Sequence, residues 1–190
     1  MPKYYQEQKI LSTDLYFHDI LFFKKGYYMR ISSISFTAMP HNYAIIDDVV
    51  SRSAQPQKED FVWLKNQGIT DVFNFRTMWN PGVNFDEKKE VEALGMKYHN
   101  IPSISARPNE QNVDRFLKEI EEVKAKGGKA HIHCKAGADR TGMYSYIYKA
   151  LNRIGSDKFN QNEMIRFGHD TKRYPNLIDW TTKLISKLRK

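Results

Sequence analysis

The only cysteine of the chain, Cys134, lies in the segment HIHCKAGADRTG at positions 131–142. It is followed by a lysine, three small residues, an aspartate, an arginine and a threonine: Lys135, Ala136, Gly137, Ala138, Asp139, Arg140 and Thr141. Small residues let the backbone curl until several N–H groups point to one centre, which forms an anion-binding nest. A thiol beside such a nest is expected to be ionised at neutral pH and therefore nucleophilic.

Arg140 adds a planar guanidinium, which binds two oxygens of one phosphate group at the same time. A thiolate, a guanidinium and converging amides together indicate that Cys134 attacks a bound phosphoryl group. The product is a cysteinyl-phosphate, which water then hydrolyses. The amides and the guanidinium neutralise the transferring oxygens, so we expect neither a metal nor a cofactor.

This chemistry needs a strand that ends at Cys134 and a helix that begins after it. The segment KAHIH, 129–133, is predicted to be a strand, and TGMYSYIYKALNRIG, 141–155, a helix. In sheets with parallel strands, ligands collect where such a turn meets the positive end of a helix. The sequence therefore places Cys134 at a ligand-binding edge.

The rest of the chain from about residue 40 alternates strands and helices. Strands are predicted within 43–51, 69–75 and 96–101, a turn at RSAQP (52–56), and helices within 57–68, 86–95, 109–128, near 160–167 and at 175–188. The clearest helix, 109–128, has Asn109 as its candidate cap and one apolar face: Val113, Phe116, Leu117, Ile120 and Val123. The alternation predicts an α/β fold with a central, mostly parallel sheet flanked by helices on both faces.

Length and composition favour one globular domain. The chain has 190 residues, of which 41% are hydrophobic, enough for one sizeable core. We assign 40–190 to that domain and expect the aromatic-rich segment 1–39, which shows no clean periodicity, to be an extension that packs on it. The single cysteine, together with the lack of a signal peptide and of a run of about 18 apolar residues, favours the cytoplasm and leaves secretion open.

The segment around Cys134 resembles a known signature. His133 and Cys134, five further residues, Arg140, Thr141 and Gly142 are similar to the H-C-x5-R-[ST]-G loop of the cysteine-dependent protein tyrosine and dual-specificity phosphatases. RSAQP and GITDVFNFR (68–76) resemble the small bacterial and fungal members, so the similarity covers roughly 40–190. The resemblance implies a protein-tyrosine-phosphatase-like fold. It also implies that Cys134 is the nucleophile, Arg140 clamps the phosphate, Thr141 helps the thiolate leave and His133 fixes the loop.

The general acid departs from the usual pattern of this superfamily. Most members carry an aspartate on a loop upstream of the cysteine, but NIPSISARPNEQ (100–111) has no carboxylate before Glu110. Asp139 is our candidate, because its Asp-Arg-Thr ending resembles myotubularins and bacterial lipid and tyrosine phosphatases. The alternative is that Asp139 only stabilises the start of the following helix. The helix end and Arg140 should lower the pKa of Asp139 and bound phosphate should raise it, so we expect an acidic pH optimum.

The substrate is expected to be a phosphorylated anion. The chain carries 30 Lys and Arg against 22 Asp and Glu, a net charge of +8. HCKAG resembles lipid phosphatases of the phosphatase-and-tensin type and, more loosely, cysteine phytases, which places Lys135 at the pocket wall. Arg76, Arg107 and Lys172 are further candidates for phosphate contacts, with ordinary surface charges as the alternative. Inositol polyphosphates or phosphoinositides are the first substrate candidates. Phosphotyrosine proteins are the alternative, and an apolar slot lined by Tyr or Phe would favour them.

Three other classes of function fit the sequence less well. A non-catalytic phosphate-binding module would typically lack the nucleophile or the arginine, and both are present. A zinc site at His131, His133 and Cys134 would need a second pair of ligands, which the sequence does not supply. The basic segment KLISKLRK (183–190) is typical of a solvated helix face, or of contact with an anionic membrane. No recognised nucleic-acid-binding motif occurs, so nucleic acid is not an expected partner.

Overall fold

The computed structural model describes residues 22–24, 27–29, 39–77 and 82–190. The chain divides into two compact units, 1–36 and 37–190. In the first unit, strand β1 (Phe22–Lys24) pairs antiparallel with β2 (Tyr27–Met29). Most of the predicted extension 1–39 lies outside the described residues, so its packing on the main domain stays a prediction.

A five-stranded mixed sheet forms the centre of the second unit. Its strands are β3 (Ala44–Ile45), β4 (Val50–Ser53), β5 (Asp71–Asn74), β6 (Lys97–Asn100) and β7 (Ala130–His133), in the order β3-β4-β7-β5-β6. Only the edge strand β3 is antiparallel to its neighbour, as predicted for a mostly parallel sheet. The central strand is β7, so Cys134 emerges from the middle of the sheet.

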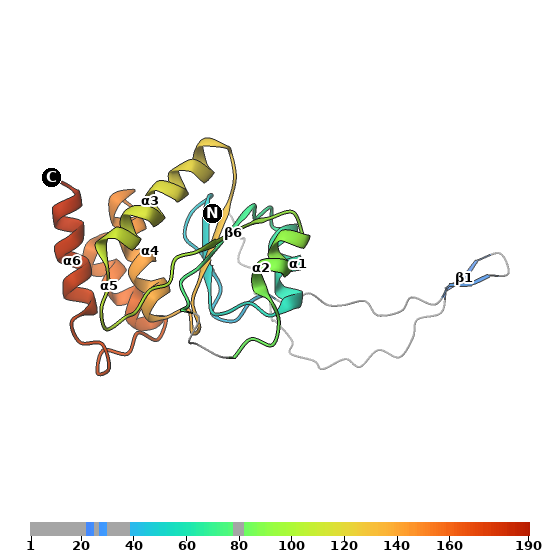
Figure 1. Ribbon diagram of the computed structural model, residues 1–190, viewed down its shortest axis with the longest axis horizontal. Coiled ribbons are helices and arrows are strands. Elements are labelled where there is room, and N and C mark those ends of the chain that lie inside the picture. The colour runs from blue at the N-terminus through green and yellow to red at the C-terminus, as the bar shows by residue number, and fades with distance from the viewer. Residues whose placement is uncertain (1–21, 25–26, 30–38, 78–81) are drawn as a thin grey trace, which may run out of the picture. The chain divides into compact units, whose positions relative to one another are not determined.

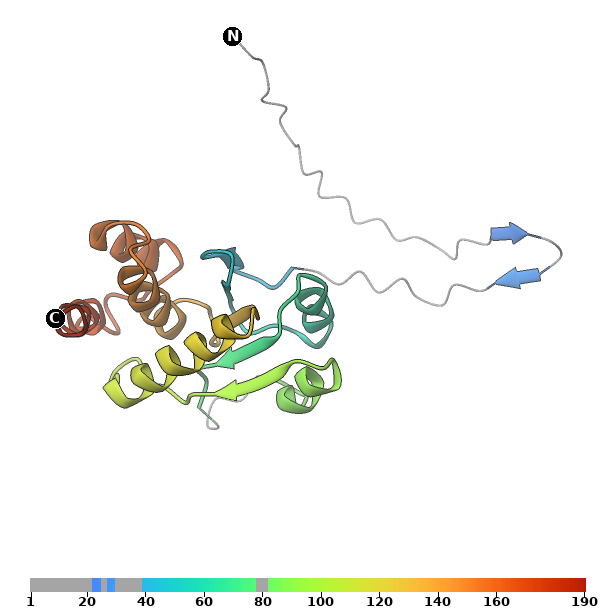
Figure 2. The same cartoon turned by 90° about the horizontal axis from the view of Figure 1, so that it is seen from above.

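Helices cover both faces of this sheet, as predicted. They are α1 (Lys58–Asn66), α2 (Glu87–Ala93), α3 (Glu110–Ala125), α4 (Asp139–Leu151), α5 (Asp157–Arg166) and α6 (Leu177–Leu188). Figures 1 and 2 show α1 and α2 on one side and α3 to α6 on the other. Two apolar cores result. A small one holds Phe61, Leu64 and Val72, and a larger one holds Ile132 and the buried faces of α3 and α4.

The predicted cap and apolar face of α3 are confirmed. The side chain of Asn109 accepts a hydrogen bond from the backbone N–H of Asn112, and Val113, Phe116, Ile120 and Val123 are buried. Because this face packs into the larger core, α3 holds the sheet edge that carries β5 and β6.

None of the helices in the described part of the chain is long and apolar enough to cross a membrane.

Several predicted boundaries were wrong, among them the following three. Arg52 and Ser53, expected in a turn, are the last residues of β4 and pair in register with β7. Polar side chains there suggested a surface turn, whereas both are buried and hydrogen-bonded. Helix α4 begins at Asp139 rather than Thr141, and α5 begins at Asp157, because the Ser156 side chain caps it.

Candidate active site

Cys134 follows β7 directly and is only 2% exposed. The loop after it enters α4 at Asp139, and no side chain caps that helix. The N–H groups at its start therefore remain available to an anion, and they carry the positive end of the helix dipole. Gly137, in the middle of the loop, has a φ of +69°, which glycine adopts without strain. The loop thus has the backbone of an anion-binding site.

A buried carboxylate supports the strand behind Cys134. Oε1 of Glu87 lies 2.8 Å from Nε2 of His133, and Oε2 accepts hydrogen bonds from Nε2 of Gln55 and Nδ2 of Asn74. Burial alone would raise the pKa of Glu87, but His133 and these hydrogen bonds hold it below its usual value. Glu87 is therefore ionised and fixes the ring of His133.

Two arginines lie on the same side of the sheet as Cys134. Arg140 donates from Nη1 to the carbonyl of Phe75 at 3.2 Å, which ties the loop to the end of β5. Arg76 is 5% exposed and donates from Nη1 to Oε1 of Gln55 at 2.6 Å. Burial lowers the pKa of Arg76, the charge of Glu87 opposes this, and Arg140 and Cys134 are close enough to act on it as well. Arg76 is therefore close enough to both Arg140 and Cys134 for their charges to interact.

Asp139 lies at the rim of the loop and is held by the segment after α5. Its Oδ1 is 2.7 Å from Nδ1 of His169 and accepts the backbone N–H of Asp170 at 3.0 Å. Burial would raise the pKa of Asp139, but the hydrogen bonds from His169 and Asp170 keep it below the usual value. The free site therefore holds Asp139 as a carboxylate at neutral pH.

A cavity of about 140 Å³ lies beside Asp139 and Arg140. Its other lining residues are Thr77, Ser103, Ile104, Ser105 and Tyr174. A second cavity, of about 300 Å³, shares Ser105 and Tyr174 with the first. It is otherwise lined by Ala106, Pro108, Arg173, Pro175, Asn176, Leu177 and Trp180. The cavity beside Asp139 and Arg140 is therefore mostly polar, with Ile104 and Tyr174 as its larger apolar groups, and the second cavity is the more apolar of the two.

The remaining predicted site residues are distributed unevenly. Thr141 is fully buried, and its hydroxyl has no hydrogen-bond partner among the described residues. Lys135 and Ala136 are exposed on the loop, and Ala138 is buried at its end. Arg107 and Lys172 are exposed, and neither lines the two cavities beside Asp139. The structure thus gathers the loop residues and Arg76, and it leaves these two cations at the surface.

The structure does not favour the zinc site, because His131, one of its candidate ligands, already has hydrogen-bond partners. His131 is fully buried between Ser51 Oγ, 2.9 Å from Nδ1, and Ser53 Oγ, 2.7 Å from Nε2. Within the described ranges, no three His, Cys, Asp or Glu side chains gather as metal ligands. His131 is a core histidine that joins β4 to β7.

Sequence reasoning missed several residues at this site. Glu87, Gln55 and His169 were not singled out, because each is an ordinary polar residue in its own segment. Arg52 was noticed only as part of RSAQP. The resemblance of that segment to small dual-specificity phosphatases was the one available signal, and it did not reveal that Arg52 contacts the loop.

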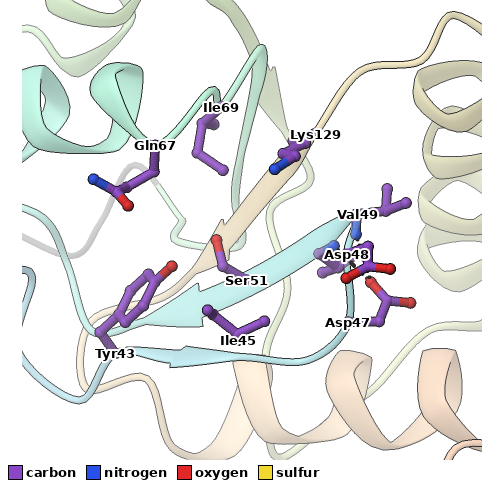
Figure 3. A pocket seen from close by; sticks show the side chains of 10 residues that line it. Tyr43, Ile45, Asp47, Asp48, Val49, Ser51, Gln67, Ile69 and Lys129 are labelled. Carbon is purple, nitrogen blue, oxygen red and sulfur yellow. Dashed lines mark hydrogen bonds between the residues drawn. The ribbon is translucent and has the colours of Figure 1, made fainter.

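A further cavity lies at the opposite strand ends. Figure 3 shows Tyr43, Ile45, Ser51 and Lys129 around it, and Asp47 and Asp48 also line it. Lys129 precedes β7, whereas Cys134 follows it. This cavity is therefore not part of the site around Cys134.

Several solved structures are similar to this chain. One from Shewanella putrefaciens, described as "Putative phosphatase (DUF442)", aligns with a TM-score of 0.67 and 21% identity over 78% of this chain and 91% of its own. The core catalytic domain of the PP-IP phosphatase SIW14 from S. cerevisiae has a TM-score of 0.63 and 17% identity, covering 80% and 96%. TpbA from P. aeruginosa, solved with pTyr, has a TM-score of 0.60 and 17% identity, covering 76% and 90%. At these identities the likeness establishes the fold.

No curated protein matches the chain. A family model does, over residues 48–150, which is more than half of the sequence. Its description reads "Polymorphic toxin system, DSP-PTPase phosphatase". The match begins just before β4 and ends within α4, so it includes the loop after Cys134 and the strands on either side of β7. The chain therefore belongs to this family of DSP-PTPase phosphatases and is a cysteine-dependent phosphatase.

Proposed function

We propose that the protein hydrolyses phosphomonoesters through a cysteinyl-phosphate on Cys134. One observation carries this proposal: Cys134 directly follows the central strand and begins the loop that leads into α4, with Arg76 and Arg140 close by. Backbone amides and guanidinium groups next to the thiol favour a phosphoryl group in transfer, since they can neutralise its oxygens. The reaction then requires no metal.

In the first step the thiolate of Cys134 attacks phosphorus and the P–O ester bond breaks. Protonated Asp139 gives its proton to the leaving oxygen, while Arg140 binds two of the remaining phosphoryl oxygens. In the second step water attacks phosphorus, Asp139 takes a proton from that water, and the S–P bond breaks. Inorganic phosphate leaves, and the thiolate is restored. The buried hydroxyl of Thr141 is suited to donate to the departing sulfur.

For the substrate, the two cavities beside Asp139 support a phosphotyrosine side chain in a peptide. Ile104 and Tyr174 line the cavity next to Arg140, and an aromatic ring packs well against such groups. The second cavity shares Tyr174 and adds Pro175 and Trp180, which suits an apolar side chain near the phosphotyrosine. The complex of TpbA with pTyr is consistent with this choice in a protein of the same fold.

Inositol polyphosphates or phosphoinositides are the second candidates. The net charge of +8 favours a substrate with several phosphates, and Arg76 lies beside Cys134. Exposed Lys135 on the loop is suited to a second phosphate of such a ring. The PP-IP phosphatase SIW14 shares the fold.

Phosphate release separates these cases. The wild type is assayed with phosphotyrosine peptides that carry Leu or Ala beside the phosphotyrosine, with inositol hexakisphosphate and with phosphoinositides in vesicles. We expect the highest kcat/KM for the Leu peptides. Preference for an inositol substrate would transfer the assignment to the second class. Cys134→Ser is expected to lose turnover by at least about a thousandfold. Absence of a ³²P-labelled S–P adduct after acid quench of the wild type would refute the covalent mechanism.

A further inference from the structure

Three consecutive backbone carbonyls of the loop are held from outside by one short segment of chain. The carbonyl of Lys135 accepts the backbone N–H of Gln55 at 3.1 Å. The carbonyl of Ala136 accepts Nδ2 of Asn42 at 3.0 Å. The carbonyl of Gly137 accepts Nη2 of Arg52 at 2.5 Å. The donors thus all come from residues 42–55, on and around β4.

These contacts determine which way the loop amides point. A peptide unit directs its N–H and C=O to opposite sides, so carbonyls drawn outward leave the N–H groups facing the anion. Of the three residues only Gly137 is buried, and its carbonyl needs a donor, since an unpaired buried carbonyl costs free energy comparable to a lost hydrogen bond. Gly137 also packs so closely that an added Cβ would lie 2.6 Å from backbone atoms of Ser53 and Ala54. The loop therefore takes its shape from β4.

Burying the charge of Arg52 behind the loop costs free energy. Its side chain is 1% exposed, its guanidinium lies 3.9 Å above the ring of Phe167, and Nη1 is 3.6 Å from Oε1 of Glu163. Nε and Nη1 have no hydrogen-bond partner among the described residues. Burial lowers the pKa of Arg52 to about 10, although the charges of Glu163 and Cys134 oppose that shift. An apolar side chain would fill this space without the cost of burying a charge.

Asn42 connects the same parts of the molecule. Besides Ala136 it donates from Nδ2 to the carbonyl of Phe167 at 3.2 Å, so the end of α5 and the loop share one amide group. Its φ is +59°, a conformation that asparagine tolerates better than most residues. Arg52 and Asn42 therefore join the loop to Phe167 from two sides.

We propose that Arg52 and Asn42 are positioning residues that hold the catalytic loop in its anion-binding shape. The inference rests on the proposed function of the loop. It adds the device that keeps the loop ready when no substrate is bound. Neither side chain needs to contact the phosphate for this role.

The test uses the full chain and the anion tungstate as probe. Arg52→Met removes the charge and the hydrogen bond, Arg52→Lys keeps the charge, and Asn42→Gly removes the amide without backbone strain. Arg166→Met, on the exposed face of α5, and Arg153→Gly, at another exposed residue with a φ of +59°, are the controls. Unfolding in urea shows which variants are folded at the assay temperature.

We expect Arg52→Met and Asn42→Gly to weaken tungstate binding by about tenfold or more each, as the loss of one such hydrogen bond implies. Both variants should also be alkylated more slowly by iodoacetate, which is itself an anion. Arg52→Lys should be affected less in both assays, because lysine can still donate a hydrogen bond. The controls should match the wild type in both assays.

Wild-type tungstate affinity and a wild-type rate of alkylation in folded Arg52→Met would overturn the proposal. If Arg52→Met does not fold, Asn42→Gly and Arg52→Lys decide, and wild-type tungstate affinity in both would be the refuting result. Tungstate binding needs only the loop. Failure of the covalent mechanism would instead appear as a missing S–P adduct in the wild type, so the two failures are distinct.

Discussion

Nε2 of His133 lies 2.8 Å from Oε1 of Glu87, and the two side chains are almost completely buried. The residue before Cys134 is thereby fixed by a carboxylate at the start of α2, on the opposite face of the sheet from α4. His133 cannot turn without breaking this contact. The pair therefore links the order of α2 to the position of Cys134.

Glu87→Gln should destabilise the fold by about 1–3 kcal/mol, because it removes the charge that three buried donors share. It should also slow alkylation of Cys134 by iodoacetate, since His133 loses its fixed orientation. Urea unfolding and alkylation rates measure the two effects. Glu92→Gln, at an exposed position on the same helix, should change the free energy of unfolding by less than about 0.5 kcal/mol. Equal effects of the two substitutions would contradict the role given to Glu87.

Asp139→Asn should affect poor leaving groups most. A general acid contributes about 10²–10⁴-fold, and only where the leaving oxygen needs its proton. We expect a loss of that size with phenyl phosphate and a much smaller one with p-nitrophenyl phosphate. Asp179→Asn, exposed on α6, is the control. Equal losses on both esters would mean that Asp139 only stabilises the helix start.

His169→Gln should move the alkaline limb of the pH profile. The hydrogen bond from His169 lowers the pKa of Asp139, so its loss should raise that pKa towards the ordinary value or above it. The acid would then stay protonated to higher pH, and the fall of kcat/KM with rising pH should begin later. Stopped assays across the acidic range measure this limb. A limb that stays in place in a folded variant would argue against proton donation by Asp139.

The contacts of buried His99 predict that the fold is sensitive to acid. Nε2 of His99 lies 2.7 Å from Asp71 and Nδ1 lies 2.6 Å from Glu119. Burial would raise the pKa values of Asp71 and Glu119, but hydrogen bonds, including those from His99, hold both below the usual range. A lowered pKa in the folded state stabilises it at pH values above the unfolded pKa. This stability is lost as the pH falls through the folded one.

Unfolding in urea should therefore show a loss of stability that begins below about pH 4, near the ordinary pKa values of Asp and Glu. Asp71→Asn should be less stable than the wild type at pH 7, and its stability should fall less as the pH is lowered. Asp48→Asn, at an exposed position, should keep the slope of the wild type. An unaltered slope in Asp71→Asn would exclude this group as a source of the acid sensitivity.

Local patterns were sufficient to predict the strand, the small-residue loop and the helix around Cys134. Apolar runs and glycine stops located most strands and helices, and the spacing from Cys134 to Arg140 predicted the enzyme class that the family match confirms. The contacts of Asp139 were not predictable, because His169 lies 30 residues further on and meets it only through the packing of α4 on α5. Its role as the acid stays a prediction.

The positions of the basic side chains outside the loop were the least predictable feature of the site. Sequence alone does not tell whether Arg76, Arg107 or Lys172 faces the loop, since each stands in a connecting segment. Arg76 is buried beside Glu87, whereas Arg107 and Lys172 are exposed away from the cavity. Arg52 was predicted in a turn because an arginine that ends a buried strand contradicts ordinary burial preferences. Such exceptions depend on long-range partners.

The tight fit of Gly137 against Ser53 and Ala54 makes catalytic competence inseparable from assembly of the sheet. In a chain in which β4 has not yet paired with β7, the loop after Cys134 lacks the contacts that fix its shape. Heat inactivation should therefore coincide with the loss of tertiary structure. During refolding, turnover should return at the same time as β4 pairs with β7. Partly folded molecules of this enzyme would be inactive rather than weakly active.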